Sequence, residues 1–267
     1  MKGRVLICAG SDSGGGAGIQ ADIKAVTALG GFAMTAVTAL TAQNTLGVQG
    51  VLGVEAPFIR AQIASSLDDL GADAVKTGML ADSATIEAVC DELAARAPGV
   101  PLVADPVMVA KGGHRLLAQD AVETLKRRLL PLATVITPNI PEAEVLAGQA
   151  ITNEGEMMDA AEAMLTLGVP AVLLKGGHME GDVLVDILAT PDGVVRFADA
   201  RIATRHTHGT GCTLASAIAA GLAQGMELRP AVERARRYVR AAILAAPGFG
   251  AGHGPLGHGV TVDVTRL

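Results

Sequence analysis

The chain has 267 residues, of which 50% are hydrophobic, and its formal net charge at pH 7 is −6. It contains one Tyr, four Phe and no Trp, so its core is aliphatic, as in a parallel sheet covered by helices. The negative charge and the lack of a basic run argue against nucleic acid as a partner. No uninterrupted apolar stretch of about 18 residues predicts a membrane span. Three widely spaced cysteines argue against a disulfide framework and for a cytoplasmic location.

Strand-like and helix-like segments alternate along the whole chain. Short apolar runs predict strands at residues 5–9, 32–40, 48–54, 72–76, 102–104, 133–137, 170–174, 183–189, 194–197 and 200–204. Helical spacing predicts helices at residues 17–29, 57–70, 83–96, 118–130, 142–147, 154–167, 214–223 and 230–244, with Ser83 as an N-cap. Glycine-rich or polar loops are expected at 10–16, 41–45 and 111–114. The alternation predicts an α/β fold, three-layered α/β/α with a mostly parallel central sheet, as one domain over residues 1–267.

Polar residues recur where the predicted strands end. In sheets of this kind, ligands bind beyond the carboxyl ends of the strands, so the recurrence predicts one long active-site cleft. The residues concerned are Ser11, Asp12, Gln43, Lys76, Asp105, Asn139 and Lys175. Asp22 falls inside the first predicted helix instead, and we expect it on a solvated face or as a cap.

The stretch from 204 to 213 places two glycines, Gly209 and Gly211, before a helix of small residues. Free backbone N–H groups and the positive dipole end make such a helix start an anion site. Cys212 lies on the same first turn, where the pKa of its thiol is expected to be lowered. An anion cradle beside a nucleophile or base suggests phosphoryl or acyl transfer. The alternative is a glycine-rich turn before a core helix.

Two carboxylates, Asp105 and Glu142, each follow a predicted strand end. Beside a phosphate site they would hold Mg²⁺ mostly through water, whereas each could instead be a helix cap. Lys175 precedes two glycines and could reach a transferring phosphate, or be a solvated turn lysine.

The carboxamide of Gln43 offers one donor and one acceptor, which matches an aminopyrimidine edge, although an ordinary loop amide would look the same. Met79 and Val107 could wall an apolar pocket for a flat ring, or belong to the core.

Several metal and nucleotide motifs are missing from the sequence. It has no HExxH and no CxxC, so zinc is not supported, and no GxxxxGK[ST]. Residues 252–257 match GxGxxG, but they lie ten residues from the C-terminus with no room for a βαβ unit. We therefore do not expect a dinucleotide site there.

Eight short blocks, in order and nearly end to end, resemble the hydroxymethylpyrimidine/phosphomethylpyrimidine kinases of thiamin biosynthesis, a family of the ribokinase-like superfamily. They are residues 9–22 (AGSDSGGGAGIQAD), 41–44 (TAQN), 76–79 (KTGM), 105–107 (DPV), 137–139 (TPN), 175–178 (KGGH), 208–212 (HGTGC) and 252–255 (GHGP). The resemblance implies the ribokinase-like fold and a homodimer. It also implies an enzyme that uses ATP and Mg²⁺ to phosphorylate 4-amino-5-hydroxymethyl-2-methylpyrimidine and then its monophosphate.

The same resemblance implies roles for individual residues. Gln43 would read the pyrimidine, and Ala17, Met79 and Val107 would contact it. The stretch from Gly209 through Gly211 to Cys212 would be the anion hole, with Cys212 where sugar kinases carry a catalytic Asp. Lys175, Asn139, His208 and Gly209 would bind the nucleotide, while Asp105 and Glu142 would organise the metal.

Three other functions stay open from the sequence. A pyridoxal or pyridoxine kinase is the nearest, and Gln43 favours the aminopyrimidine over it. A non-catalytic ligand-binding regulator on the same fold would not need Asp105, Glu142, Lys175 and Cys212 together. A thiol acyltransferase at Cys212 lacks a His–acid pair near it in sequence.

Overall fold

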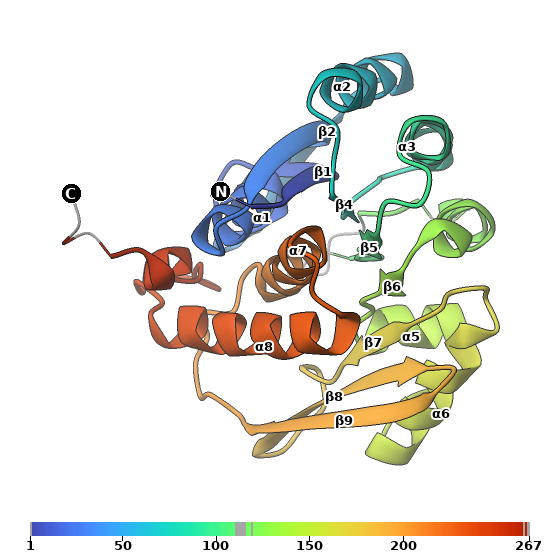
Figure 1. The fold of residues 1–267 in the computed structure, drawn as a ribbon. Helices are drawn as coiled ribbons and strands as arrows, with labels where there is room; N and C mark the ends of the chain where they lie inside the picture. The colour runs from blue at the N-terminus through green and yellow to red at the C-terminus, as the bar shows by residue number, and fades with distance from the viewer. Residues whose placement is uncertain (1, 110–115, 119, 264, 266–267) are drawn as a thin grey trace.

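One sheet of nine strands runs through the part of the chain that the computed structural model describes, residues 2–109, 116–118, 120–263 and 265 (Figure 1). The order is β3-β2-β1-β4-β5-β6-β7-β8-β9, parallel from β2 to β7 and antiparallel at β3, β8 and β9. The strands are β1 (Arg4–Asp12), β2 (Phe32–Asn44), β3 (Gly47–Gly53), β4 (Ala74–Thr77), β5 (Leu102–Ala104), β6 (Val135–Ile136), β7 (Val172–Lys175), β8 (Val183–Thr190) and β9 (Gly193–Ala200).

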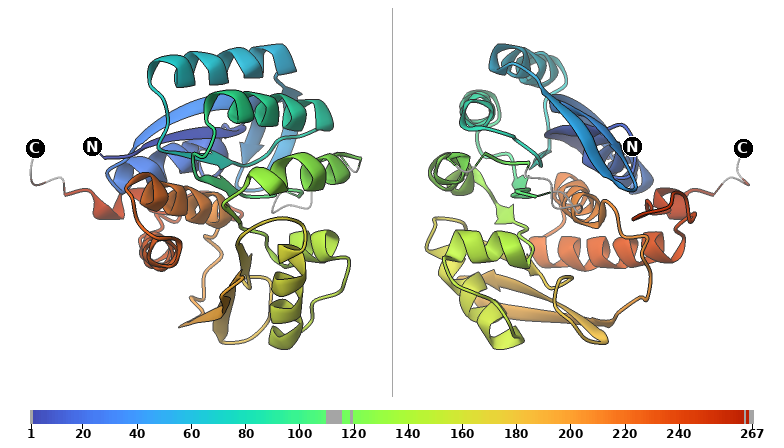
Figure 2. Two further views of the ribbon diagram at one scale, coloured as in Figure 1. Left: turned by 45° about the vertical axis from the view of Figure 1, so that its right-hand side comes forward. Right: turned by 180° about the vertical axis from the view of Figure 1, so that it is seen from behind.

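Helices cover both faces of this sheet, as the two further views in Figure 2 show. One layer consists of α1 (Gly18–Ala28), α7 (Thr210–Ala223) and α8 (Leu228–Leu244). The other consists of α2 (Ala56–Asp69), α3 (Ser83–Arg96), α4 (Ala121–Thr124), α5 (Ile140–Ala147) and α6 (Glu154–Leu165). Alternate strand residues face opposite layers: Val5 and Ile7 pack with α1 and α7, while Leu6 and Cys8 pack with α2 and α3. The predicted three-layer α/β fold is confirmed.

Two predicted loops belong in part to strands. Strand β1 continues to Asp12, and β2 continues through Gln43 to Asn44, where it pairs with Gly47 of β3. The predicted strand at 200–204 is wrong beyond Ala200. The ladder ends there because Ala200 pairs with Val183, the first residue of β8, and the residues that follow pair with no other strand among those that the structure describes.

Several helix boundaries differ from the predicted ranges; α7, for example, begins at Thr210 rather than at residue 214. Ser83 is the first helical residue rather than the cap; the side chain of Asp82 caps the helix by accepting from the Thr85 backbone N–H at 2.8 Å. The helix predicted at 118–130 begins at Ala121 and continues as a π-helical turn, η1 (Leu125–Leu129), and a 3₁₀ turn, η2 (Leu130–Leu132). The loop predicted at 111–114 lies outside the described residues.

The glycine-rich tail folds back onto the helices. A 3₁₀ turn, η3 (His258–Thr261), brings the His258 carbonyl to within 2.8 Å of the hydroxyl of Tyr238 on α8, which donates to it. The His258 ring Nε2 lies 2.9 Å from the Thr213 hydroxyl of α7. A Cβ at Gly252 would lie 2.0 Å from the Thr45 carbonyl oxygen, so the GxGxxG match serves close packing of the tail. Within the described residues, none of the helices combines the length and apolarity needed to cross a membrane.

Candidate active site

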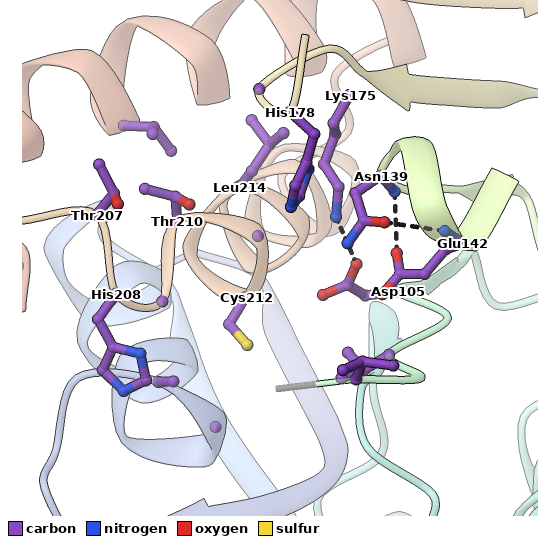
Figure 3. A pocket seen from close by; sticks show the side chains of 18 of the residues that line it. Asp105, Asn139, Glu142, Lys175, His178, Thr207, His208, Thr210, Cys212 and Leu214 are labelled. Atoms are coloured by element: carbon purple, nitrogen blue, oxygen red, sulfur yellow. Dashed lines mark hydrogen bonds and ion pairs between the residues drawn. The ribbon is translucent and has the colours of Figure 1, made fainter. Parts of the chain in front are cut away.

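A cavity of about 730 Å³ lies beyond the carboxyl ends of the parallel strands. Every residue that the sequence predicts for the site lines it: Ala17, Gln43, Met79, Asp105, Val107, Asn139, Glu142, Lys175, His208, Gly209, Gly211 and Cys212. In Figure 3, Lys175, Asp105, Asn139 and Glu142 lie on one side of Cys212, and His208 lies on the other. The strand ends therefore bring residues that are far apart in sequence into one cleft.

The glycines before α7 shape one wall of the cavity. Gly209 is the N-cap of α7 and has a left-handed backbone with φ of +82°, which favours glycine. A Cβ there would lie 1.9 Å from the Gly16 carbonyl oxygen. A Cβ at Gly211 would lie 3.2 Å from the Lys175 Nζ. Gly209 thus allows the first loop to approach closely, and Gly211 keeps space in front of Lys175. Both lie at a helix start whose first-turn N–H groups lack intrahelical acceptors, the geometry of an anion cradle.

A lysine–carboxylate pair faces this cradle. The Lys175 Nζ lies 2.9 Å from the Asp105 Oδ1, which also accepts from the Thr137 hydroxyl at 3.0 Å. Burial acts to raise the pKa of Asp105, but Lys175, Lys76 and the hydroxyl outweigh it and lower the pKa. Burial acts to lower the pKa of Lys175, but Asp105 and Glu142 outweigh it and raise the pKa. A charged ammonium therefore lies beside the helix start.

Glu142 caps a helix and lines the cavity at the same time. Its Oε2 accepts from the Asn139 backbone N–H at 2.9 Å, while the Asn139 Oδ1 accepts from the Glu142 N–H at 3.0 Å. Glu142 thus forms a capping box with Asn139, so the alternative that it caps a helix is confirmed. Burial raises the pKa of Glu142 to about 7; Lys175 opposes this shift, and Asp105 adds to it.

The oxygen donors on this wall fit Mg²⁺. The carboxylates of Asp105 and Glu142 are hard ligands, as this ion prefers. In the part of the chain that the structure describes, no three His, Cys, Asp or Glu side chains converge as a closed metal cage. An ion here would accordingly be held mostly through water and phosphate oxygens, the usual arrangement for magnesium at nucleotides.

The opposite wall joins the first glycine loop to the turn before α7. The Asp12 carboxylate accepts from the backbone N–H groups of Gly14, Gly16 and Ala17 at 2.8, 3.0 and 2.7 Å. Its Oδ2 also lies 3.0 Å from the His208 Nε2. Burial acts to raise the pKa of Asp12, but His208 and the amides outweigh it and lower the pKa. The His208 ring thus lies against the first loop, close to Gln43.

The prediction for the Cys212 thiol was wrong in sign. Burial raises the pKa of Cys212 to about 11. Lys76 and a hydrogen bond from the Gly18 backbone oppose the shift, whereas the carboxylates of Asp22 and Asp105 add to it. The sequence placed Cys212 correctly on the first turn of α7. It could not show that burial and two carboxylates would outweigh the helix dipole there.

The prediction for Asp22 was also wrong. Its side chain is fully buried and pairs with the equally buried Lys76, whose Nζ lies 3.0 and 2.9 Å from the two carboxylate oxygens. Ser216 of α7 donates to the same carboxylate at 2.7 Å. Burial acts to lower the pKa of Lys76, but Asp22, Cys212 and Asp105 outweigh it and raise the pKa. Asp22 thereby ties α1, β4 and α7 together beneath the cavity.

Sequence reasoning missed several apolar residues of the cavity lining. Ile202, Leu214, Val239 and Ile243 line the cavity, from the segment after β9, from α7 and from α8. The apolar stripe of α8 was a visible signal, but it indicates only that one face of the helix is buried. Which of its residues border a cavity depends on how α8 packs against α7.

This chain is similar to known proteins over nearly its whole length. The family model described as phosphomethylpyrimidine kinase matches residues 12–257. A hydroxymethylpyrimidine/phosphomethylpyrimidine kinase of Rhizobium meliloti is 49% identical, covering 97% of each chain. The bifunctional thiamine biosynthesis protein ThiED of Geobacter sulfurreducens is 51% identical over 99% of this chain, which spans 54% of that protein's length.

Two solved structures are similar over nearly the whole fold. The phosphomethylpyrimidine kinase of Clostridium difficile has a TM-score of 0.80 and 42% identity, over 91% of this chain and 100% of that one. The ADP complex of Bacillus subtilis pyridoxal kinase has a TM-score of 0.90 and 36% identity, over 100% of both chains. The neighbours confirm the ribokinase-like fold, and with the family model they show that this chain belongs to the phosphomethylpyrimidine kinase family.

Proposed function

We propose that this protein is an ATP-dependent kinase that phosphorylates 4-amino-5-hydroxymethyl-2-methylpyrimidine and then its monophosphate, yielding the diphosphate used to make thiamin. One observation carries the proposal. A single cavity joins a glycine cradle at a helix N-terminus, the Lys175–Asp105 pair on one side of the cradle and the carboxamide of Gln43 on the other. That arrangement suits an alcohol and a nucleotide triphosphate that meet at the cradle.

The alcohol belongs on the side of Gln43. In this proposal Ala17, Met79 and Val107 enclose the flat ring, and the Gln43 carboxamide binds its nitrogen edge. The hydroxymethyl oxygen then lies near Cys212, and the γ-phosphate lies over the first-turn N–H groups at Gly209 and Gly211.

In this proposal the nucleotide lies on the side of Lys175 and of the apolar lining residues from α7 and α8. Leu214, Val239 and Ile243 suit a flat purine, while Asn139 belongs to the wall beside the phosphates. Lys175 neutralises charge on the transferring phosphoryl group, the main contribution that a protein makes to such a loose transition state. Asp105 and Glu142 would hold Mg²⁺ through water, and the ion would supply further charge neutralisation.

Cys212 serves in this proposal as a hydrogen-bonding neighbour of the substrate hydroxyl. A thiol with its pKa raised to about 11 is protonated at neutral pH, so it does not offer a ready thiolate base. Phosphoryl transfer depends mostly on positioning and charge stabilisation, and it can proceed without a strong base.

The proposal includes a cytoplasmic homodimer of one-domain subunits. The single sheet that crosses the described residues supports one domain. The edge strand β3 exposes Val51 and Leu52, and the neighbouring Leu40 and Leu46 are exposed as well. An aliphatic edge strand of this kind is covered in stable proteins, and a second copy would cover it. Sedimentation analysis would test the dimer.

A coupled ADP-release assay tests the reaction. We expect ATP turnover with the hydroxymethylpyrimidine and, separately, with its monophosphate. Turnover of only one would contradict the two-step reaction. Higher kcat/KM for pyridoxal would favour the pyridoxal kinase alternative, which the similarity to the Bacillus subtilis enzyme keeps in view. Lack of ADP release with all three would favour a ligand-binding regulator.

A further inference from the structure

The first glycine loop and the turn before α7 are packed into one unit at the alcohol side of the cavity. A Cβ at Gly16 would lie 2.5 Å from the His208 Cδ2, and one at Gly209 would lie 1.9 Å from the Gly16 carbonyl oxygen. The Asp12 carboxylate gathers three backbone N–H groups of the loop and reaches the His208 Nε2 at 3.0 Å. Movement of the His208 ring would therefore move the loop that carries Ala17.

The protonation of this contact is defined by its surroundings. The side chains of Asp12 and His208 are only 3% and 12% exposed. Asp12 is ionised, because the three backbone donors and His208 lower its pKa despite burial. An ionised carboxylate can only accept hydrogen bonds. The His208 Nε2 must therefore carry a hydrogen and act as the donor in its hydrogen bond to Asp12.

The same ring nitrogen faces Gln43. The Gln43 Nε2 lies 3.4 Å from the His208 Nε2, and the Gln43 Oε1 accepts from the Thr41 hydroxyl at 3.2 Å. Two N–H donors cannot hydrogen-bond to each other. As long as His208 donates to Asp12, it cannot accept from the Gln43 amide, whose N–H groups stay available to an acceptor in the cavity.

We infer that Asp12 and His208 form a positioning pair for the alcohol substrate: the pair fixes the first loop and keeps the Gln43 amide free to donate to a ring nitrogen. The inference deepens the proposed function and rests on it. It assigns His208 to the alcohol side rather than to the nucleotide, and it defines the substrate class as a flat heteroaromatic alcohol with an acceptor nitrogen on the edge that faces Gln43.

Three variants separate this positioning role from nucleotide binding. His208→Leu removes the donor, whereas His208→Gln keeps an N–H donor on a chain of similar reach. Asp12→Asn removes the obligate acceptor, so the His208 Nε2 no longer has to carry a proton and can accept from the Gln43 amide. His253→Leu, a change at an exposed histidine of the tail, is the matched control.

Steady-state kinetics and calorimetric binding of the hydroxymethylpyrimidine provide the readouts. We expect His208→Leu and Asp12→Asn to raise the KM and Kd for the alcohol by about tenfold or more, as for loss of a charge-assisted hydrogen bond. The KM for ATP should change by less than about twofold, and His208→Gln should recover most of the loss. The double variant that combines His208→Leu with Asp12→Asn should be no worse than the poorer single variant.

A rise in the KM for ATP with an unchanged KM for the alcohol would overturn the inference and assign His208 to the nucleotide. If His208→Leu and His208→Gln raise the KM and Kd for the alcohol equally, the His208 ring contributes by packing and not by its hydrogen bond. If His208→Leu does not fold, the comparison of Asp12→Asn with His208→Gln carries the same test. A wild-type protein that releases no ADP with the pyrimidine would refute the proposed function, whereas an active wild type without the KM split would refute the pair alone.

Discussion

Two lysine–carboxylate pairs lie close together, one in the cavity wall and one beneath the cavity, and they differ in how completely the lysine is bonded to its own carboxylate. Lys76 and Asp22 are both fully buried, the ammonium contacts both carboxylate oxygens, and Ser216 donates to the same carboxylate. Lys175 and Asp105 share one contact of 2.9 Å, and the lysine side chain is 14% exposed. In the first pair, the buried ammonium is bonded to both oxygens of its own carboxylate. The second leaves N–H groups of Lys175 free to bind a phosphate, which is why we assign the reaction to it.

This difference predicts that removing the charge of Lys175 lowers kcat and leaves the stability of the fold nearly unchanged. Lys175→Gln keeps a donor for Asp105 but removes the positive charge beside the cradle. We expect kcat to fall by about 10²–10³-fold, as when a single stabilising donor of a transition state is removed. The melting temperature should hardly change. A variant with wild-type kcat would end the assignment of Lys175 to the transferring phosphate.

Loss of the first charge should cost stability. Lys76→Met leaves the Asp22 carboxylate buried without its counter-ion, so we expect the free energy of unfolding to fall by about 3–5 kcal/mol. Urea unfolding measures it. The double variant Lys76→Met with Asp22→Leu has no stranded charge and should recover most of the loss. A double variant as unstable as the single one would show that packing, and not charge pairing, is what the pair contributes.

Cys212 gives a third and smaller test of the comparison, because charges from both pairs act on the pKa of its thiol. Its pKa of about 11 implies a thiolate fraction of about 1% at pH 9. The rate of alkylation by iodoacetamide, followed by mass spectrometry, should rise about tenfold per pH unit from pH 7 to 10. Cys212→Ser is the control and should show no labelling at this position. A plateau below pH 9 would instead indicate a stabilised thiolate and revive the base role.

Much of the fold follows from local pattern. Alternating apolar runs identified the strands of the sheet, and polar residues after them identified the cleft, because the ends of parallel strands meet at one edge. The end of β9 did not follow, since it depends on where its partner β8 begins. Residues 201–204 have the composition of a strand, but within the described part of the chain the ladder with β8 stops at Ala200.

The environment of buried polar groups was the part that sequence could not supply. Asp22 reads as a surface residue of a helix, and only the packing of α1 against β4 and α7 brings it to Lys76 and Ser216. For Cys212, helical position predicts the opposite pKa shift from the one that burial produces. From its sequence position His208 belongs to the phosphate turn, whereas its ring lies against Asp12, the last residue of β1, 196 positions away in sequence.

The contact between the tail and α8 can be followed by the absorbance of a single tyrosine. Tyr238 is the only tyrosine of a chain without tryptophan, and it is 4% exposed with its hydroxyl on the His258 carbonyl. Burial raises the pKa of Tyr238 to about 12. A spectrophotometric alkaline titration therefore follows one phenol without background. If the tail detaches, Tyr238 should ionise at a lower pH. Phenolate absorbance would then appear at a pH where the protein with its tail in place shows none.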